Sequence, residues 1–222
     1  MVSVVDCLRT SKELGIVKIS TVEMASSPSI IARKTKKEDL ADVLAMIQEL
    51  ADFEQMSDGP QLTVEDLVRD GGFHEEQPQK APVFHSFVLE LMEPVNAAEA
   101  NNEEIRTSSS TSSNLSTRHN KSHLIGYAIC FYSYSTWQGK SFFLEDLYVK
   151  PAYRKYGYGK LLFRTLVKHA RENDCARFDF HVLAWNPAKE FYHAMGAQNL
   201  TEAEQWEFFR LTREQMDKLC EN

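Results

Sequence analysis

The chain has 222 residues, of which 43% are apolar and 26% are charged, and its formal net charge is -7. This balance is typical of a globular protein with one domain of ordinary size. The negative charge argues against a nucleic-acid surface, which needs clustered cations, and no stretch reaches the ~18 apolar residues of a membrane helix. An acidic cleft could concentrate a cationic small molecule, although the charge could also serve solubility alone.

The cysteines and histidines give no sign of a metal site or a disulfide framework. Cys7, Cys130, Cys175 and Cys220 form no close pair, and the seven histidines lack ligand spacing. This pattern fits a reducing, cytoplasmic setting. Residues 1–27 lack the features of a secretory signal, and we expect a disordered tail before one domain over residues 28–222.

The first half of the domain predicts strands and helices around a long insertion. Thr35 and Glu38 have the spacing of a capping box, and apolar residues at helical spacing predict a helix over residues 40–54. A strand is predicted over residues 83–91. Residues 93–122 are rich in Asn, Glu, Ser and Thr and contain too few apolar side chains to offset the entropy of ordering, so they predict a disordered insertion.

The second half contains further strands and helices. We expect strands over 124–134, 141–150, 177–183 and 206–211, and helices over 158–172, 187–195 and from 213 onward. Hairpin strands come first and strand–helix–strand units follow. The order predicts an α/β fold in which a central mixed sheet has helices on both faces.

A glycine-containing turn between a strand and a helix is the first candidate site. Gly157 and Gly159 would let the backbone approach a ligand closely, and the free amides that begin the helix can bind phosphate oxygens. Arg154 and Lys160 add positive charge. Such turns also occur without a ligand.

Two carboxylates and a tyrosine are the second candidate site. Glu145 and Asp146 are adjacent on a predicted strand and should face opposite sides of the sheet. Either carboxylate could bind a cation or simply be solvated or paired. Tyr192 lies on a predicted helix and could be a proton donor or a core residue. The residues alone leave these alternatives open.

The motifs resemble those of the GNAT superfamily. Arg154, Gly157 and Gly159 follow an apolar strand with the spacing of that superfamily's coenzyme A loop. The segment Asn186–Tyr192, followed by Met195-Gly196-Ala197, is similar to its second motif. The wider resemblance covers nearly all of 28–212 outside the insertion and is to the diamine acetyltransferases of the spermidine/spermine and thialysine types. It is carried by Phe53-Glu54, Tyr134–Trp137, Leu144–Asp146 and Gly196–Glu204.

The resemblance implies the GNAT fold and an N-acetyltransferase that moves an acetyl group from acetyl-CoA to a primary amine by direct attack in a ternary complex. It implies no metal, a homodimer, and neither nucleic acid nor a membrane as partner. The residues that it assigns to the coenzyme are Leu147, Tyr148, Val149, Arg154, Lys155, Tyr156, Gly157, Tyr158, Gly159, Lys160, Asn186, Pro187, Ala188 and Tyr192.

The resemblance also implies catalytic roles. An alkylamine is almost entirely ammonium at neutral pH, so a base must remove a proton before attack, and Glu145 is the candidate. The Val149 amide would stabilise the oxyanion, and Tyr192 would protonate the departing thiolate. The residues expected to line the amine site are Phe53, Glu54, Trp137, Glu145, Asp146 and Glu204.

Three departures from the family pattern bear on the substrate. Lys155 stands where the family usually has glycine, and the segment from Asn186 to Tyr192 is one residue shorter than usual. Ser135 stands where polyamine-type enzymes carry an acid, which favours a thialysine-like amino acid or a short diamine. Spermidine or spermine is the alternative substrate, and a catalytically weak binding or adaptor protein is the alternative of another class.

Overall fold

The computed structural model describes residues 28–74, 81–93 and 121–221. The expected tail over 1–27 and almost all of the expected insertion, 94–120, lie outside the described residues. The chain divides into two units, residues 32–89 with 125–222 and residues 1–31 with 90–124. The functional residues predicted above all belong to the first unit.

The strands form one five-stranded mixed sheet in the order β1-β2-β3-β4-β5. β4 pairs antiparallel with β3 and parallel with β5, which confirms the predicted mixed sheet. The parallel pair is joined by a helical crossover, as parallel strands require. The strands are β1 (Ser29–Lys34), β2 (His85–Glu93), β3 (Lys121–Ser135), β4 (Gly139–Val149) and β5 (Arg177–Phe180).

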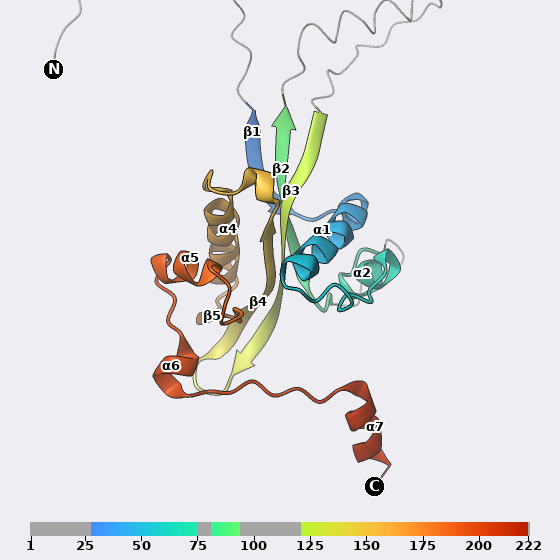
Figure 1. Ribbon diagram of the computed structural model, residues 1–222, viewed down its shortest axis with the longest axis vertical. Coiled ribbons are helices and arrows are strands. Elements are labelled where there is room, and N and C mark those ends of the chain that lie inside the picture. The colour runs from blue at the N-terminus through green and yellow to red at the C-terminus, as the bar shows by residue number, and fades with distance from the viewer. Residues whose placement is uncertain (1–27, 75–80, 94–120, 222) are drawn as a thin grey trace, which may run out of the picture. The chain divides into compact units, whose positions relative to one another are not determined.

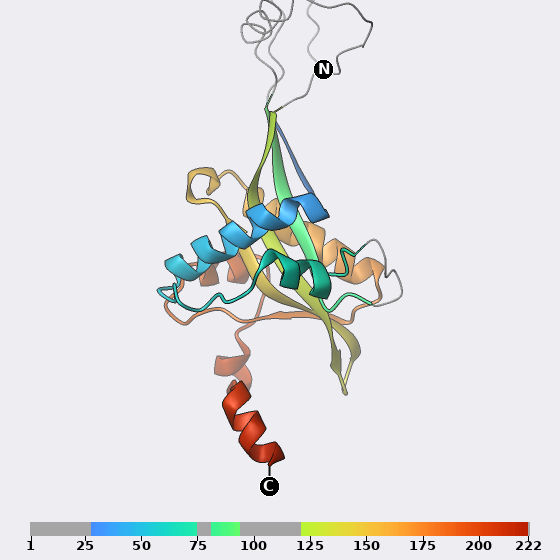
Figure 2. The same cartoon turned by 90° about the vertical axis from the view of Figure 1, so that its right-hand side faces the viewer.

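Helices cover both faces of the sheet in the first unit. Figure 1 shows α1 and α2 on one face and α4 and α5 on the other, and Figure 2 shows α1 crossing in front of the strands. No described helix is long and apolar enough to cross a membrane. The helices are η1 (Lys37–Asp39), α1 (Leu40–Phe53), α2 (Val64–Asp70), η2 (Pro151–Tyr153), α4 (Tyr158–Glu172), α5 (Ala188–Ala194), α6 (Leu200–Glu204) and α7 (Arg213–Cys220).

The core lies between the sheet and the inner faces of α1 and α4. Leu40, Val43 and Met46 recur at helical spacing on α1 and are buried, as are Leu162 and Leu166 on α4. Burying a side chain of this size contributes about 1.5–3 kcal/mol. The thiols of Cys130 and Cys175 are buried in this core as well.

The start of α1 differs from the prediction. The Thr35 hydroxyl donates to Ser86 Oγ at 2.7 Å, and no capping box with Glu38 forms. Asp39 takes that place: its carboxylate accepts from the Lys36 amide at 2.7 Å and pairs with Arg33 at 2.6 Å. A partner from another strand therefore overrides the local sequence signal.

The predicted last strand over 206–211 is wrong. Residues 205–212 form neither a helix nor a strand, and no described strand pairs with them. The apolar and aromatic residues of 206–211 are typical of a strand, yet every side chain from Thr201 to Glu221 is exposed. The predicted helix from residue 213 onward is confirmed as α7, which begins with a capping box of Thr212 and Gln215.

Candidate active site

The centre of the site is a place where two parallel strands separate. β4 pairs with β5 from Ser141 to Leu144, but β5 ends at Phe180 while β4 continues to Val149. The backbone from Glu145 to Val149 therefore lies beyond the end of its β5 ladder. An extended ligand with amide groups could pair with such an edge as an additional strand does.

The glycine turn follows this edge directly. Gly157 has φ +86°, and a Cβ there would meet nothing within 4 Å, so glycine is required for the backbone conformation. α4 begins at Tyr158. The Leu161 amide donates to the Gly157 carbonyl oxygen at 3.0 Å, and this is the first hydrogen bond between the helix and the turn. The preceding first-turn amides can therefore bind an anion.

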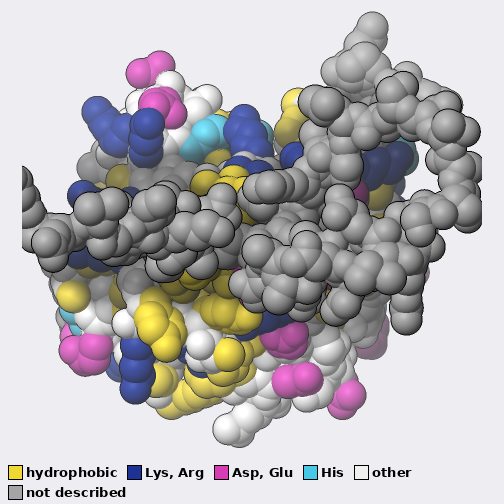
Figure 3. Space-filling view, turned by 90° about the horizontal axis from the view of Figure 1, so that it is seen from above, with side chains coloured by type: hydrophobic (Ala, Val, Ile, Leu, Met, Phe, Trp, Pro, Cys, Tyr) yellow, Lys and Arg dark blue, Asp and Glu magenta, His cyan; other side chains and the backbone are white. Residues whose placement is uncertain are grey.

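Lys155 adopts φ +68°, the left-handed conformation that favours glycine. The turn thus has the backbone angle that suits glycine, the usual residue of the family here, and a lysine in this conformation lowers the stability by about 1 kcal/mol. Where described residues are visible from above in Figure 3, Lys and Arg, Asp and Glu, and hydrophobic side chains are mixed.

The Arg154 guanidinium contacts the end of β4 that lies beyond its pairing with β5. Its Nε donates to the Val149 carbonyl at 2.8 Å, and its Cζ lies 5.3 Å from the Phe53 ring centre and 5.4 Å from that of Tyr148. The Tyr148 hydroxyl donates to Glu49 Oε2 at 2.9 Å. These contacts tie the edge to α1.

Tyr192 lies on α5, on the face of the sheet opposite α1 (Figure 1). Its ring centre is 4.5 Å from that of Phe180, where β5 ends, and 5.7 Å from that of Phe163 on α4. Burial, with the nearby charges of Asp146 and Glu54, raises the pKa of Tyr192 to about 12. The phenol is therefore protonated at neutral pH and can donate a proton.

A half-buried carboxyl group, that of Asp146, lies near Tyr192. Tyr127, which is 0% exposed, donates its hydroxyl proton to Asp146 Oδ2 at 3.0 Å. Burial raises the pKa of Asp146 to about 6, and the charges of Glu145 and Glu54 add to that rise. Burial also raises the pKa of Glu54, which caps the C-terminus of α1. The opening between β4 and β5 therefore favours the binding of a cationic ligand.

The predicted second motif forms as a capped helix start. Asn186 Oδ1 accepts from the Ala188 amide at 2.9 Å, and α5 follows directly. This positions Tyr192 in the second turn of α5 although the segment is one residue short. Trp185, just before the motif, packs against Phe53 at 5.8 Å between ring centres.

Two predicted amine-site residues lie away from the acidic group within one chain. Trp137 is 80% exposed in the β3–β4 turn, eight residues before Glu145, or about 26 Å along an extended strand. Glu204 is exposed at the end of α6 and accepts from Trp206 Nε1 at 2.7 Å. Glu54, Asp146 and Tyr192 lie closer together, since the charges of Asp146 and Glu54 raise the pKa of Tyr192 and the charge of Glu54 raises that of Asp146. Phe53 directly precedes Glu54 at the end of α1.

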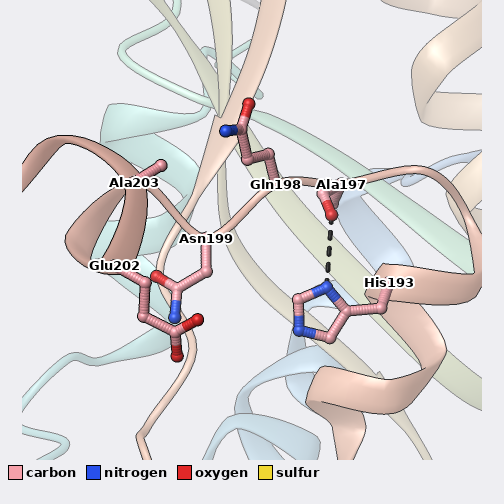
Figure 4. A pocket seen from close by; sticks show the side chains of 6 residues that line it. All are labelled: His193, Ala197, Gln198, Asn199, Glu202 and Ala203. Atoms are coloured by element: carbon pink, nitrogen blue, oxygen red, sulfur yellow. Dashed lines mark hydrogen bonds between the residues drawn. The ribbon is translucent and has the colours of Figure 1, made fainter.

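A shallow cavity lies elsewhere among the described residues, beyond α5. Figure 4 shows that His193, Gln198 and Glu202 are among its lining side chains, with His193 Nδ1 bonded to the Ala197 carbonyl at 3.3 Å. The cavity has a volume of about 430 Å³ but is shallow and open. It contains none of the predicted reacting groups.

Sequence reasoning missed Tyr127 and Gly126. Tyr127 binds Asp146 from the neighbouring strand, and no local motif marks it. Gly126 lies where a Cβ would come within 2.6 Å of the Tyr148 carbonyl oxygen. A glycine inside a predicted strand is the one signal that could have indicated this close approach.

Comparison with known proteins identifies the family. Residues 82–197 match the family model described as the acetyltransferase (GNAT) family. The chain belongs to the GNAT acetyltransferase family. The thialysine N-epsilon-acetyltransferase of Sus scrofa is 33% identical to it over 193 residues, which cover 86% of this chain and 98% of that protein.

Two further similarities extend this finding. The spermidine/spermine N(1)-acetyltransferase-like protein 1 of Homo sapiens is 31% identical over 83% of this chain and 23% of its own length. An aminoglycoside N-acetyltransferase solved with CoA shares the fold, with a TM-score of 0.54 and 16% identity over 85% of this chain and 97% of that one. The chain is thus an N-acetyltransferase, of a family that uses acetyl-CoA.

Proposed function

We propose that this enzyme transfers the acetyl group of acetyl-CoA to the primary amine of a thialysine-like amino acid or a short diamine, in a ternary complex. The observation that carries the proposal is the opening between β4 and β5, which has at one end a turn that could bind an anion and beside it two half-buried acids, Glu54 and Asp146. The coenzyme and the cationic amine would meet there.

The coenzyme would lie along the open edge of β4. The backbone of Leu147–Val149 would pair with the amides of its pantetheine arm, and the turn over Arg154–Lys160 would hold its diphosphate with free helix amides. Asn186–Ala188 would line the other side. The acetyl-CoA thioester would then lie near Tyr192.

The amine would approach from the acidic side. Glu54 and Asp146, with Glu145 exposed nearby, supply negative charge, and Phe53 supplies an apolar wall for the methylene chain. A carboxylate of the Glu145–Asp146 pair would take the ammonium proton, and the Tyr192 phenol would protonate the departing thiolate. The Val149 amide would stabilise the tetrahedral oxyanion.

The preference for a short substrate rests on Ser135. Its hydroxyl oxygen accepts from the Trp137 and Gln138 amides at 3.2 and 3.3 Å, so it closes the hairpin turn and adds no charge. A long polycation therefore has one carboxylate fewer to bind. The similarity to thialysine N-epsilon-acetyltransferases supports the same choice.

An amine panel tests the substrate directly. Initial rates with saturating acetyl-CoA would be measured for thialysine, putrescine, spermidine and spermine. We expect the highest kcat/KM for thialysine or putrescine. Much faster turnover of spermidine or spermine would replace this substrate with the polyamine alternative, and no turnover of any amine would favour the adaptor alternative.

The role of Tyr192 has its own test. Tyr192→Phe removes the proton but keeps the ring that packs on Phe180, so kcat should fall about 10²-fold or more while the affinity for acetyl-CoA stays within a few-fold. Tyr134→Phe is a matched control, because it makes the same change at an exposed position on β3. An unchanged kcat in Tyr192→Phe would remove this residue from its role.

We also propose a homodimer in the cytoplasm. The exposed segment after α6 carries Trp206, Phe208 and Phe209, each more than half exposed, and a second copy is the simplest surface to bury them. Glu204 directly precedes this segment, so such packing would carry it toward the other copy. Phe208→Glu with Phe209→Glu should convert a dimer to a monomer in light scattering, and an unchanged mass would contradict this interface.

A further inference from the structure

A β-bulge decides which of the two adjacent carboxylates lies inside. In the β3–β4 ladder Cys130 pairs with Leu144 and Ile129 pairs with Asp146, so Glu145 has no partner on β3. A bulge of this kind leaves the extra residue outside the ladder and redirects the side chains around it. Glu145 is exposed, whereas Asp146 is partly buried opposite Ile129.

The surroundings of Asp146 come from four elements. Tyr127 on β3 donates to its Oδ2 at 3.0 Å, and Cys130 on the same strand has its pKa raised by burial and by the Asp146 charge. Glu54 approaches from the end of α1, Tyr192 from α5, and Glu145 is its neighbour on β4. No cation is among these groups, so a substrate ammonium would be the compensating charge.

We propose that Asp146, oriented by Tyr127, rather than the neighbouring Glu145, accepts the proton of the substrate ammonium. This inference rests on the proposed function. Tyr127 occupies Oδ2, which leaves Oδ1 for the incoming N–H group. Tyr192 and Asp146 influence each other's charge, so the proton acceptor and the proton donor belong to one opening.

The proton balance of the reaction closes with these two groups. The ammonium gives one proton to Asp146, and the nitrogen lone pair forms the C–N bond with the thioester carbonyl carbon. The C–S bond then breaks, and the thiolate takes the phenol proton of Tyr192. The surplus proton on the new amide nitrogen restores Tyr192, and Asp146 returns its proton to water.

The electrostatics support different roles for Asp146 and Glu145. A base works best when its pKa lies near the working pH, and burial brings the pKa of Asp146 to about 6. The exposed Glu145 carboxylate is better placed to attract the cation at the entrance. Glu145 would therefore affect KM, and Asp146 would affect the pH dependence of turnover.

The test is the pH profile of kcat/KM for Asp146→Asn, Glu145→Gln and the surface control Asp42→Asn, which lies exposed on α1. We expect the wild-type rate to fall on the acidic side with a midpoint near 6. For Asp146→Asn, kcat/KM at neutral pH should be at least 100-fold lower than for the wild type, and the fall of kcat/KM on the acidic side (the acidic limb) should disappear. Glu145→Gln should keep the limb. The proposal is overturned if Asp146→Asn keeps it or Glu145→Gln loses it.

Two further readouts separate proton transfer from damage to the fold. Substrate analogues fluorinated beside the reacting nitrogen are mostly free amine, so they should restore much of the activity of Asp146→Asn; an equal loss for all amines would contradict the proposal. Tyr127→Phe removes a hydrogen bond that lowers the pKa of Asp146, so its acidic limb should move to higher pH. An unmoved limb would exclude Tyr127 as the positioning residue.

These outcomes are distinct from failure of the proposed function. If the wild-type enzyme binds no acetyl-CoA or acetylates no amine, the function itself is wrong. If the wild type is active and Asp146→Asn binds acetyl-CoA normally with an unchanged pH profile, only the assignment of Asp146 is wrong.

Discussion

Replacing Asp146 with asparagine should stabilise the fold at alkaline pH. Folding raises the pKa of this carboxyl from 3.8 to about 6, chiefly through burial. Well below pH 3.8 the Asp146 carboxyl is protonated in both the folded and the unfolded state, so it does not lower the free energy of unfolding. As the pH rises through both values the folded state resists losing the proton, and stability falls by about 1.4 kcal/mol for each unit of the shift.

The expected gain for Asp146→Asn is therefore about 3 kcal/mol at pH 8 and roughly half of that at pH 5. The amide oxygen of asparagine can still accept the Tyr127 hydrogen bond. Urea unfolding at one protein concentration, without coenzyme, measures the difference, with Asp42→Asn as the control. A variant that is less stable than the wild type at pH 8, or a difference that does not grow with pH, would refute the reasoning.

Three other substitutions test the backbone of the site. Lys155→Gly relieves the left-handed conformation at φ +68° and should raise the free energy of unfolding by about 1 kcal/mol in urea titrations; a loss would contradict the strain. Gly126→Ala would place a Cβ 2.6 Å from the Tyr148 carbonyl oxygen, so the urea midpoint should fall by the equivalent of about 1–3 kcal/mol, and no change would contradict that close approach. Gly159→Ala meets only a Val149 methyl group at 3.9 Å, so thermal unfolding should show stability unchanged or up to about 1 kcal/mol higher, while calorimetry should show weaker acetyl-CoA binding. Unimpaired binding would exclude close contact there.

Local patterns predicted the parts of the site that local chemistry determines. The glycine turn, the start of α4 at Tyr158 and the helix that carries Tyr192 all follow from spacing and capping within a few residues. The mixed sheet followed from the order of the elements. The family resemblance then gave these parts a chemical meaning that spacing alone did not.

The remaining features depend on contacts between distant segments. The bulge at Glu145 arises from the register of two strands, and alternation along one strand cannot reveal it. Tyr127 is 19 residues from Asp146 in sequence. The segment over 206–211 is similar to a strand in its aromatic and apolar content, but no described strand of the sheet pairs with it.

Calorimetric titration of the purified protein with acetyl-CoA tests the central claim most directly, because binding at the open edge of β4 and the turn that ends at Gly157 must precede any transfer. The account predicts saturable binding of one acetyl-CoA for each chain, weakened in Gly159→Ala and retained in Tyr192→Phe. Absence of any saturable binding to the folded wild-type protein would contradict it.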